Sequence, residues 1–95
     1  MAIGQILQFP GVSVDTYDAV RREIGWDGKK GSPDGLLAHA AGPVGDGFCV
    51  AEWWSSEAAW DKFFAERLAP AFEVVGGMPQ PQVTRFDVHA SYIAS

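Results

Sequence analysis

Two residues in the middle of the chain have side chains that can move or hold a proton in an otherwise apolar setting. His39 lies in the run LLAHAAG, and Glu52 lies among tryptophans in the run FCVAEWWS. A histidine within reach of a substrate proton can act as a general base when another group orients its ring. A carboxylate is seldom buried without a partner, which His39 or Arg85 could supply. His39 is therefore the candidate catalytic residue, and Glu52 is a candidate site residue.

Each of these residues also has a structural interpretation. His39 can be bonded simply to backbone or to Glu52, since polar groups inside folds are usually satisfied. Glu52 can pair with Arg85 across a dimer interface instead of lining a ligand site. The second histidine, His89, lies near the chain end, where a structural role or a place at a dimer seam is the simpler expectation.

Aromatic side chains are concentrated around the same glutamate. The stretch CVAEWWSSEAAWDKFFAERL holds three tryptophans and two phenylalanines within sixteen residues. Trp60, Phe63 and Phe64 recur at helical spacing, as on any buried helix, so most of the set is expected in the core. A pocket for a flat apolar molecule uses such side chains together with a few polar groups. The candidate substrate-binding residues are Tyr17, Glu52, Trp54, Trp60 and Phe64.

Metal and nucleotide sites are not indicated by the sequence. Cys49, His39 and His89 match no metal-ligand spacing. GPVGDG joins two predicted strands and does not open a helix, so it is no phosphate loop or dinucleotide fingerprint. We accordingly expect no metal and no cofactor, and we expect Cys49 to be a buried, inert thiol.

Composition and charge narrow the class of partners. Ninety-five residues fit one domain, and a formal net charge of −5 with scattered basic residues argues against nucleic acid and anionic membranes. No apolar run approaches the roughly 20 residues of a membrane span. The first residues lack the basic start and the cleavage site of a signal peptide. We therefore expect a cytoplasmic protein with a single domain over residues 1–95.

Turn residues and alternation predict four strands. They are expected over Ala2–Phe9, over LLAHAAG, over FCVAEWWS and over Gln82–Ile93, with a hairpin turn near Val44 and Gly45. With two intervening helices the order is β-α-β-β-α-β, which is typical of the ferredoxin-like α+β fold, a four-stranded antiparallel sheet with helices on one face. Right-handed crossovers place the first and third strands in the centre.

Capping residues mark the two helices. Ser13 is a natural N-cap for the first helix, and Gly25 closes it. Ser55 or Ser56 caps the second helix, which Pro70 is expected to kink or end. The run AFEVVGG is expected to add a short helical piece.

Alternation also divides the strand residues between two faces of the sheet. The expected register places His39 roughly opposite Val50 and so on the face of Glu52 and Trp54. One face carries Phe48, Val50, Glu52, Trp54, Val83, Arg85, Asp87 and His89, and the other carries Cys49, Ala51, Trp53, Thr84, Phe86, Val88 and Ala90. Both faces hold large apolar groups, but two helices can cover only one. We expect a homodimer in which a second copy covers the other.

The element order and one local pattern resemble a known superfamily. In AEWWSSEAAWDKFF, the residues Glu52, Trp54, Ser56, Glu57 and Ala58 match its strand-to-helix pattern. The sequence resembles the dimeric α/β-barrel superfamily, and within it small proteins similar to antibiotic-biosynthesis monooxygenases. The resemblance implies a ferredoxin-like homodimer that handles a hydrophobic or aromatic small molecule.

Members of the superfamily include cofactor-independent oxygenases of polycyclic aromatics, haem-degrading enzymes, polyketide cyclases and proteins of unknown role. The resemblance implies a cofactor-independent monooxygenase for aromatic or polyketide-like substrates, with His39 as the base and Trp54 and Trp60 as walls. Two alternatives stay open: a polyketide cyclase-like enzyme without oxygen chemistry, and a non-catalytic ligand-binding or structural dimer. Oxygenase-like members often carry a histidine early in the second helix, where this chain has Phe63 and Phe64, and this difference favours the non-catalytic alternative.

Overall fold

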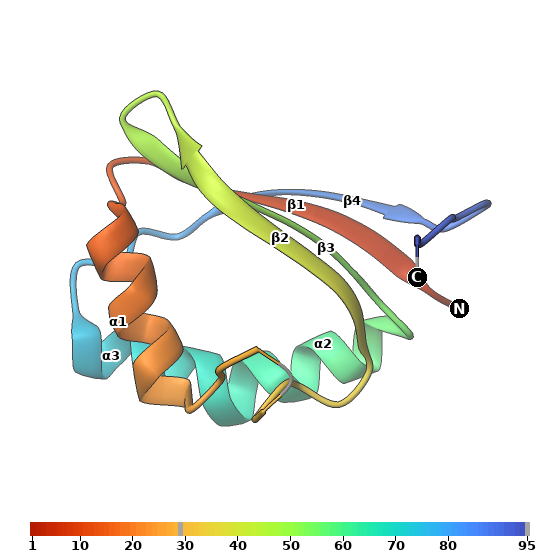
Figure 1. Ribbon diagram of the computed structural model, residues 1–95, viewed down its shortest axis with the longest axis horizontal. Helices are drawn as coiled ribbons and strands as arrows, with labels where there is room; N and C mark the ends of the chain where they lie inside the picture. Colours follow the sequence, from red (N-terminus) through yellow and green to blue (C-terminus); the bar gives the residue numbers. More distant parts are fainter. Residues whose placement is uncertain (29, 95) are drawn as a thin grey trace.

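The computed structural model describes residues 1–28 and 30–94 and consists of a four-stranded antiparallel sheet with its helices on one face (Figure 1). The elements in chain order are β1 (Ile3–Phe9), α1 (Val14–Ile24), β2 (Leu36–Val44), β3 (Gly47–Trp54), α2 (Glu57–Phe63), a π-helical turn η1 (Phe64–Leu68), α3 (Ala69–Val75) and β4 (Gln82–Asp87). The strands lie in the order β2-β3-β1-β4, with β1 and β3 in the centre as right-handed crossovers require. The predicted ferredoxin-like α+β fold is confirmed.

The first helix begins and ends where the sequence predicts. The hydroxyl of Ser13 accepts a hydrogen bond from the backbone N–H of Thr16 at 3.2 Å. Gly25 closes the helix in the left-handed conformation at φ +76°, which glycine adopts without steric cost. Fixed at both ends, α1 holds Tyr17 and Arg21 one turn apart on neighbouring positions of its surface.

The second helical region is interrupted in a way the sequence only partly predicts. Ser56, not Ser55, caps α2 and accepts the backbone N–H of Ala59 at 3.1 Å. A π-helical turn then begins at Phe64 and leads directly into α3. Pro70 lies in the first turn of α3, directly after the π-helical turn, in which the N–H of Ala69 bonds to the carbonyl of Phe64 five residues back. Pro70 therefore begins a helical segment and does not end the helical run.

The β2–β3 hairpin is longer than predicted and shifts the expected register by two residues. The hairpin closes at Val44 and Gly47, so Gly45, at φ +58°, lies in a short turn. His39 consequently pairs with Glu52, and Ala41 takes the place opposite Val50. A shift of two residues keeps every side chain on its face, so the prediction that His39 shares the face of Glu52 and Trp54 is confirmed.

The last strand is shorter than predicted. It ends at Asp87, which pairs with Ile3 at the beginning of β1. Val88 still donates a backbone hydrogen bond to Ala2 at 2.9 Å, but β1 offers no further residue to pair. Residues 88–93 therefore leave the sheet, and the prediction of a strand through Ile93 is wrong. His89 lies in this exposed segment, outside the sheet.

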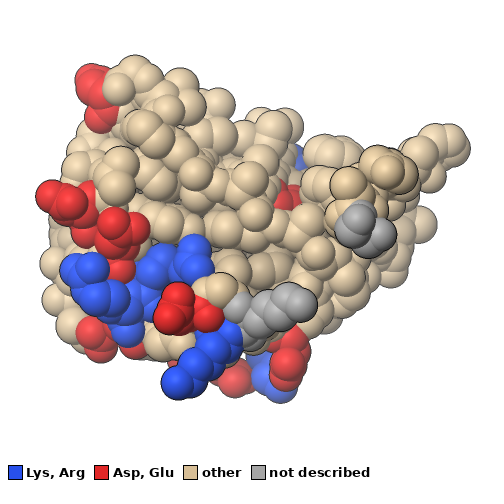
Figure 2. Space-filling model, in the orientation of Figure 1, with Lys and Arg blue, Asp and Glu red and all other residues tan. Residues whose placement is uncertain are grey.

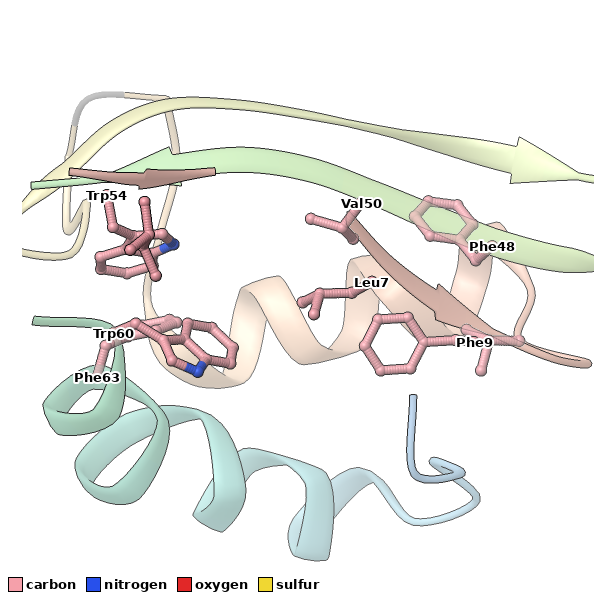
Figure 3. Packing of buried hydrophobic residues seen from close by; sticks show 9 residues of the cluster. Leu7, Phe9, Phe48, Val50, Trp54, Trp60 and Phe63 are labelled. Atoms are coloured by element: carbon pink, nitrogen blue, oxygen red, sulfur yellow. The ribbon is translucent and has the colours of Figure 1, made fainter. Parts of the chain in front are cut away.

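Aromatic side chains from the sheet and from α2 meet in the core. Trp54 is fully buried at 0% exposure, and its ring lies 5.6 Å from that of Trp60 and 5.4 Å from that of Phe63, centroid to centroid. Figure 3 shows Trp54 directed from the sheet toward these two helical residues, with Leu7 and Phe9 farther along the same layer. Burying a large apolar side chain fully contributes about 1.5–3 kcal/mol. This aromatic layer therefore fixes α2 against the sheet.

The opposite face of the sheet carries no helix in the described residues (Figure 1). Apolar side chains stand exposed there, among them Ile6 at 37% and Phe86 at 55% exposure. Phe86 packs over Gly4 of the neighbouring strand, where any side chain would collide with its ring. We call this surface, formed by Ile6, Ala51, Trp53, Thr84 and Phe86, the open face.

Candidate proton-transfer site

A cavity of about 60 Å³ lies between the covered face of the sheet, the helices and the loop after α1. Most of its wall is apolar and includes Leu7, Val20, Phe48, Val50, Trp60 and Phe63. Four polar side chains also line it: Tyr17, Arg21, His39 and Glu52. An apolar cavity with a few convergent polar groups is the usual form of a small-molecule site.

Glu52 is the centre of the polar network although only 5% of it is exposed. Its Oε1 accepts hydrogen bonds from the Trp54 indole N–H at 3.0 Å and from the Gln5 amide nitrogen at 2.9 Å. Its Oε2 lies 2.9 Å from Nδ1 of His39. A buried carboxylate without partners would cost several kcal/mol, and here its oxygens are satisfied by side chains of three strands.

The hydrogen bonds of the network have a direction. Indole N–H groups only donate, so Oε1 of Glu52 must accept. With Glu52 as a carboxylate, Nδ1 of His39 carries the ring proton and donates it to Oε2. Nε2 then has a free lone pair, and the hydroxyl of Tyr17, 2.7 Å away, donates to it. This arrangement makes Nε2 the basic atom of the ring.

The far end of the network lies on α1 and the loop that follows. Nη1 of Arg21 donates to the Tyr17 hydroxyl at 2.8 Å, and Nε of Arg21 donates to the carbonyl of Trp26 at 3.3 Å. The Arg21 guanidinium stacks on the Trp26 ring at 3.9 Å, and the same ring packs edge-on against His39 at 4.7 Å. Arg21 thus joins the hydroxyl that faces His39 to the aromatic ring that covers it.

On the other side of Glu52, the hydrogen bonds continue from Gln5 on β1 to Arg85 on β4 and reach the surface at Glu57. Arg85 of β4 donates from Nε and Nη2 to Oε1 of Gln5, at 3.0 and 2.9 Å, and from Nη1 to Glu57 at 2.8 Å. Gln5 therefore lies between Arg85 and Glu52. This geometry disagrees with the alternative in which Glu52 pairs directly with Arg85 across a dimer interface, because Glu52 faces the helices and its partners belong to its own chain.

The structure brings together most of the candidate site residues. His39, Tyr17, Glu52 and Trp60 line the cavity. Trp54 does not, because its ring is buried behind the cavity wall, where its indole N–H holds Glu52. Phe64 is also outside the lining: the π-helical turn directs it outward, so 37% of it is exposed and its ring packs on Trp60.

Three residues of the network were not identified from the sequence. Gln5 alternates with Ile3 and Leu7, so a polar residue at an inward strand position was a signal that could have been recognised. Arg21 follows Tyr17 by four residues, the spacing of neighbours on a helix. Trp26 lies in a glycine-rich loop without periodicity, and nothing in the sequence placed it over His39.

Within residues 1–28 and 30–94, no three His, Cys, Asp or Glu side chains come together in a way that could hold a metal ion. Over the same residues, no helix combines the length and the hydrophobicity needed to cross a bilayer.

Solved structures with the same fold include oxygenases. SnoaB, a cofactor-independent oxygenase from Streptomyces nogalater, is 10% identical, with 95% of each chain covered and a TM-score of 0.66. A monooxygenase from Streptomyces coelicolor, in complex with nanaomycin D, is 18% identical over 99% of this chain and 93% of its own, with a TM-score of 0.61. The chain shares their fold.

A protein of unknown function from Nitrosomonas europaea also has this fold, with 13% identity over 99% of this chain and 95% of its own and a TM-score of 0.71. No protein-family model and no curated protein sequence matches the chain. The resemblance to antibiotic-biosynthesis-monooxygenase-like proteins is thus confirmed as a likeness of fold.

Proposed function

We propose that the protein is a cofactor-independent monooxygenase that acts on an aromatic or polyketide-like molecule in the cavity, with His39 as the base. The observation that carries the proposal is the position of His39. Its ring lies at the wall of an apolar cavity, with a carboxylate 2.9 Å from Nδ1 and a hydroxyl 2.7 Å from Nε2. A base that a carboxylate orients is the arrangement that proton abstraction requires.

The proton path follows from the fact that both ring nitrogens of His39 are engaged. A substrate hydroxyl or acidic C–H approaches the Tyr17 oxygen, Tyr17 passes its own proton to Nε2, and the substrate proton replaces it. His39 then carries a positive charge beside the Glu52 carboxylate. Arg21, 2.8 Å from the Tyr17 oxygen, compensates negative charge that develops there or on the substrate.

The oxidation itself needs no electron carrier, because the substrate anion supplies the electrons to O₂. In the overall reaction a ring CH₂ group and O₂ give a C=O group and water. One oxygen atom enters the product, and the other leaves with both hydrogens. The apolar walls, Trp60 and Phe48 among them, keep bulk water from the reacting anion.

The cavity must widen to admit such a substrate. Its 60 Å³ is small beside the roughly 150 Å³ of cavities that take up benzene. Trp26 is the wall residue best placed to move, because it is only partly buried and lies on the loop after α1. We infer that binding displaces Trp26 and leaves the strand residues His39 and Glu52 in place.

We also propose that the protein is a homodimer, with the open faces of two copies packed together. The exposed side chains of Ile6 and Phe86 support this arrangement. The catalytic network lies on the opposite face of the sheet, so each subunit keeps its own cavity.

The test is to follow oxygen consumption and product formation with a panel of anthrones, naphthols and hydroquinones. We expect oxygen uptake in a one-to-one ratio with a ketone or quinone product. Conversion without oxygen uptake would favour the cyclase-like alternative. Quenching of tryptophan fluorescence by these compounds without conversion would favour the non-catalytic alternative.

A further inference from the structure

We propose that Gln5 and Arg85 are positioning residues that keep Glu52 a proton acceptor and thereby keep Nε2 of His39 basic. The proposal rests on the proposed function in one respect only, the use of Nε2 as a base. Neither residue belongs to the cavity wall. Gln5 is 1% exposed on β1, and Arg85 reaches it from the neighbouring strand β4.

Arg85 determines which way the Gln5 amide faces. A guanidinium group only donates hydrogen bonds, and two of its nitrogens lie 3.0 and 2.9 Å from Oε1 of Gln5. The amide oxygen of Gln5 must therefore face Arg85, and its NH₂ group must face Glu52. Arg85 is itself held in place by Glu57 at the start of α2.

The Gln5 amide in turn constrains Glu52. Its NH₂ group and the Trp54 indole N–H both donate to Oε1 of Glu52, so this oxygen can carry no proton of its own. Hydrogen bonds to a carboxylate favour the charged form. The ionised state then leaves Oε2 free to accept the Nδ1 proton of His39.

The His39–Glu52 pair has a second possible proton arrangement, which would abolish the base. In it the pair has taken up one proton from solvent: Oε2 of Glu52 carries the added proton and donates it to Nδ1, while the ring proton has moved to Nε2 and points at Tyr17. The heavy-atom contacts are the same in both arrangements, but only the first offers a lone pair to Tyr17. Gln5, held by Arg85, stabilises the first arrangement because its N–H donates more strongly to Oε1 when Glu52 is ionised than when Glu52 is a neutral acid.

The test is nitrogen NMR of ¹⁵N-histidine-labelled protein, which distinguishes protonated from unprotonated ring nitrogens. His89→Gln, in the exposed segment after β4, removes the second histidine signal. The wild-type ring is expected to be protonated on Nδ1. In Arg85→Met and Gln5→Met the Nε2–H fraction should rise roughly threefold to tenfold, as the loss of one net hydrogen bond implies. Arg22→Met and Gln8→Met, at exposed positions on α1 and β1, are the matched controls.

Wild-type chemical shifts for His39 in both Arg85→Met and Gln5→Met would overturn the proposal. If Gln5→Met does not fold, Arg85→Met and Arg85→Lys decide the question, because Arg85 is partly exposed and Lys restores one charged donor. The measurement uses neither substrate nor oxygen, so its failure is distinct from failure of the proposed oxygenase function. If His39 of the wild-type protein is protonated on Nδ1 but no substrate causes oxygen uptake, only the proposed oxygenase function is contradicted.

Discussion

At the residue scale the site is built around Glu52, whose two oxygens receive hydrogen bonds from three side chains. The glutamate stands at an inward strand position, where an apolar residue would contribute more to the core. Its presence there is explained by His39 on the neighbouring strand, which it orients. The Glu52 carboxylate both stabilises the fold and orients the proposed base. Unfolding experiments measure the first role, and turnover measures the second.

Glu52→Gln should destabilise the fold by about 1–3 kcal/mol, because the neutral amide loses the charge-assisted hydrogen bonds of the carboxylate and its NH₂ group requires His39 to carry its ring proton on Nε2. Urea unfolding at a fixed protein concentration measures the change. Glu57→Gln is the matched control: its side chain is 60% exposed and bonds only to Arg85 among the contacts of the described residues, so less than about 0.5 kcal/mol is expected. An unfolding free energy for Glu52→Gln equal to that of wild type would show that the carboxylate is not needed by its three partners.

The sequence predicted the members of the site better than their contacts. Alternation on β3 placed Glu52 and Trp54 on one face, and the hairpin brought His39 to it. The hydrogen bonds from Gln5 and Tyr17 could not be predicted, because they join β1 and α1 to β3 across 47 residues and to β2 across 22. Contacts of that separation depend on how strands and helices pack, which no local pattern specifies.

At the element scale, the loop after α1 is fastened by a residue distant in sequence. Nη2 of Arg67, in the π-helical turn, donates to the carbonyls of Ile24 and Gly31, each at 2.7 Å. The same loop carries Trp26, whose ring packs against His39, so these two hydrogen bonds hold a loop that forms part of the cavity wall. The charged groups in Figure 2 gather over the lower part of the molecule, where α1 ends and this loop lies.

Arg67→Met should therefore loosen the loop without unfolding the sheet. We expect amide hydrogen exchange at Trp26, Asp27 and Lys30 to accelerate roughly tenfold or more, since hydrogen bonds from a charged donor contribute about 1.5–3 kcal/mol. Mass-spectrometric or NMR exchange measures it, with Lys62→Met, an exposed position on α2, as the control. Unchanged exchange at these three amides would mean that the loop is held by its own turns.

The two ends of α1 were the most predictable boundaries, and the end of the last strand was the least predictable. Capping at Ser13 and Gly25 is local chemistry that a sequence displays directly. The end of β4 depends instead on where β1 begins, because a strand stops when its partner does. Alternation in residues 88–93 signals a strand, but no neighbouring strand in the described chain is there to receive it.

At the scale of the whole molecule, the chain exposes more surface than a compact monomer needs. Its accessible surface is 6072 Å², against about 5300 Å² expected for a monomer of this mass. Exposed apolar side chains contribute to this surface both on the open face and in the segment after β4, where Tyr92 is 85% exposed. A second copy on the open face would remove part of this excess.

Light scattering at micromolar concentration should accordingly give about twice the chain mass. Ile6→Lys should shift the equilibrium toward the monomer, because it places a charge in the centre of the open face. Val14→Lys, an exposed aliphatic position on α1, should leave the mass unchanged. A stable wild-type monomer under these conditions would contradict the packing of sheet on sheet.

The central claim is that His39 is the base that receives a proton through Tyr17 when the substrate is deprotonated, and steady-state turnover of its alanine variant tests this claim most directly. Loss of an acid–base group typically lowers the rate about 10²- to 10⁴-fold. On a substrate that the oxygen-uptake panel identifies, the turnover of His39→Ala should fall by this range while the protein stays folded, with a melting temperature lowered by loss of the hydrogen bond to Glu52. His89→Ala, outside the sheet, should retain nearly full turnover. Equal turnover for wild type and a folded His39→Ala would contradict the account and leave the cavity as a binding site only.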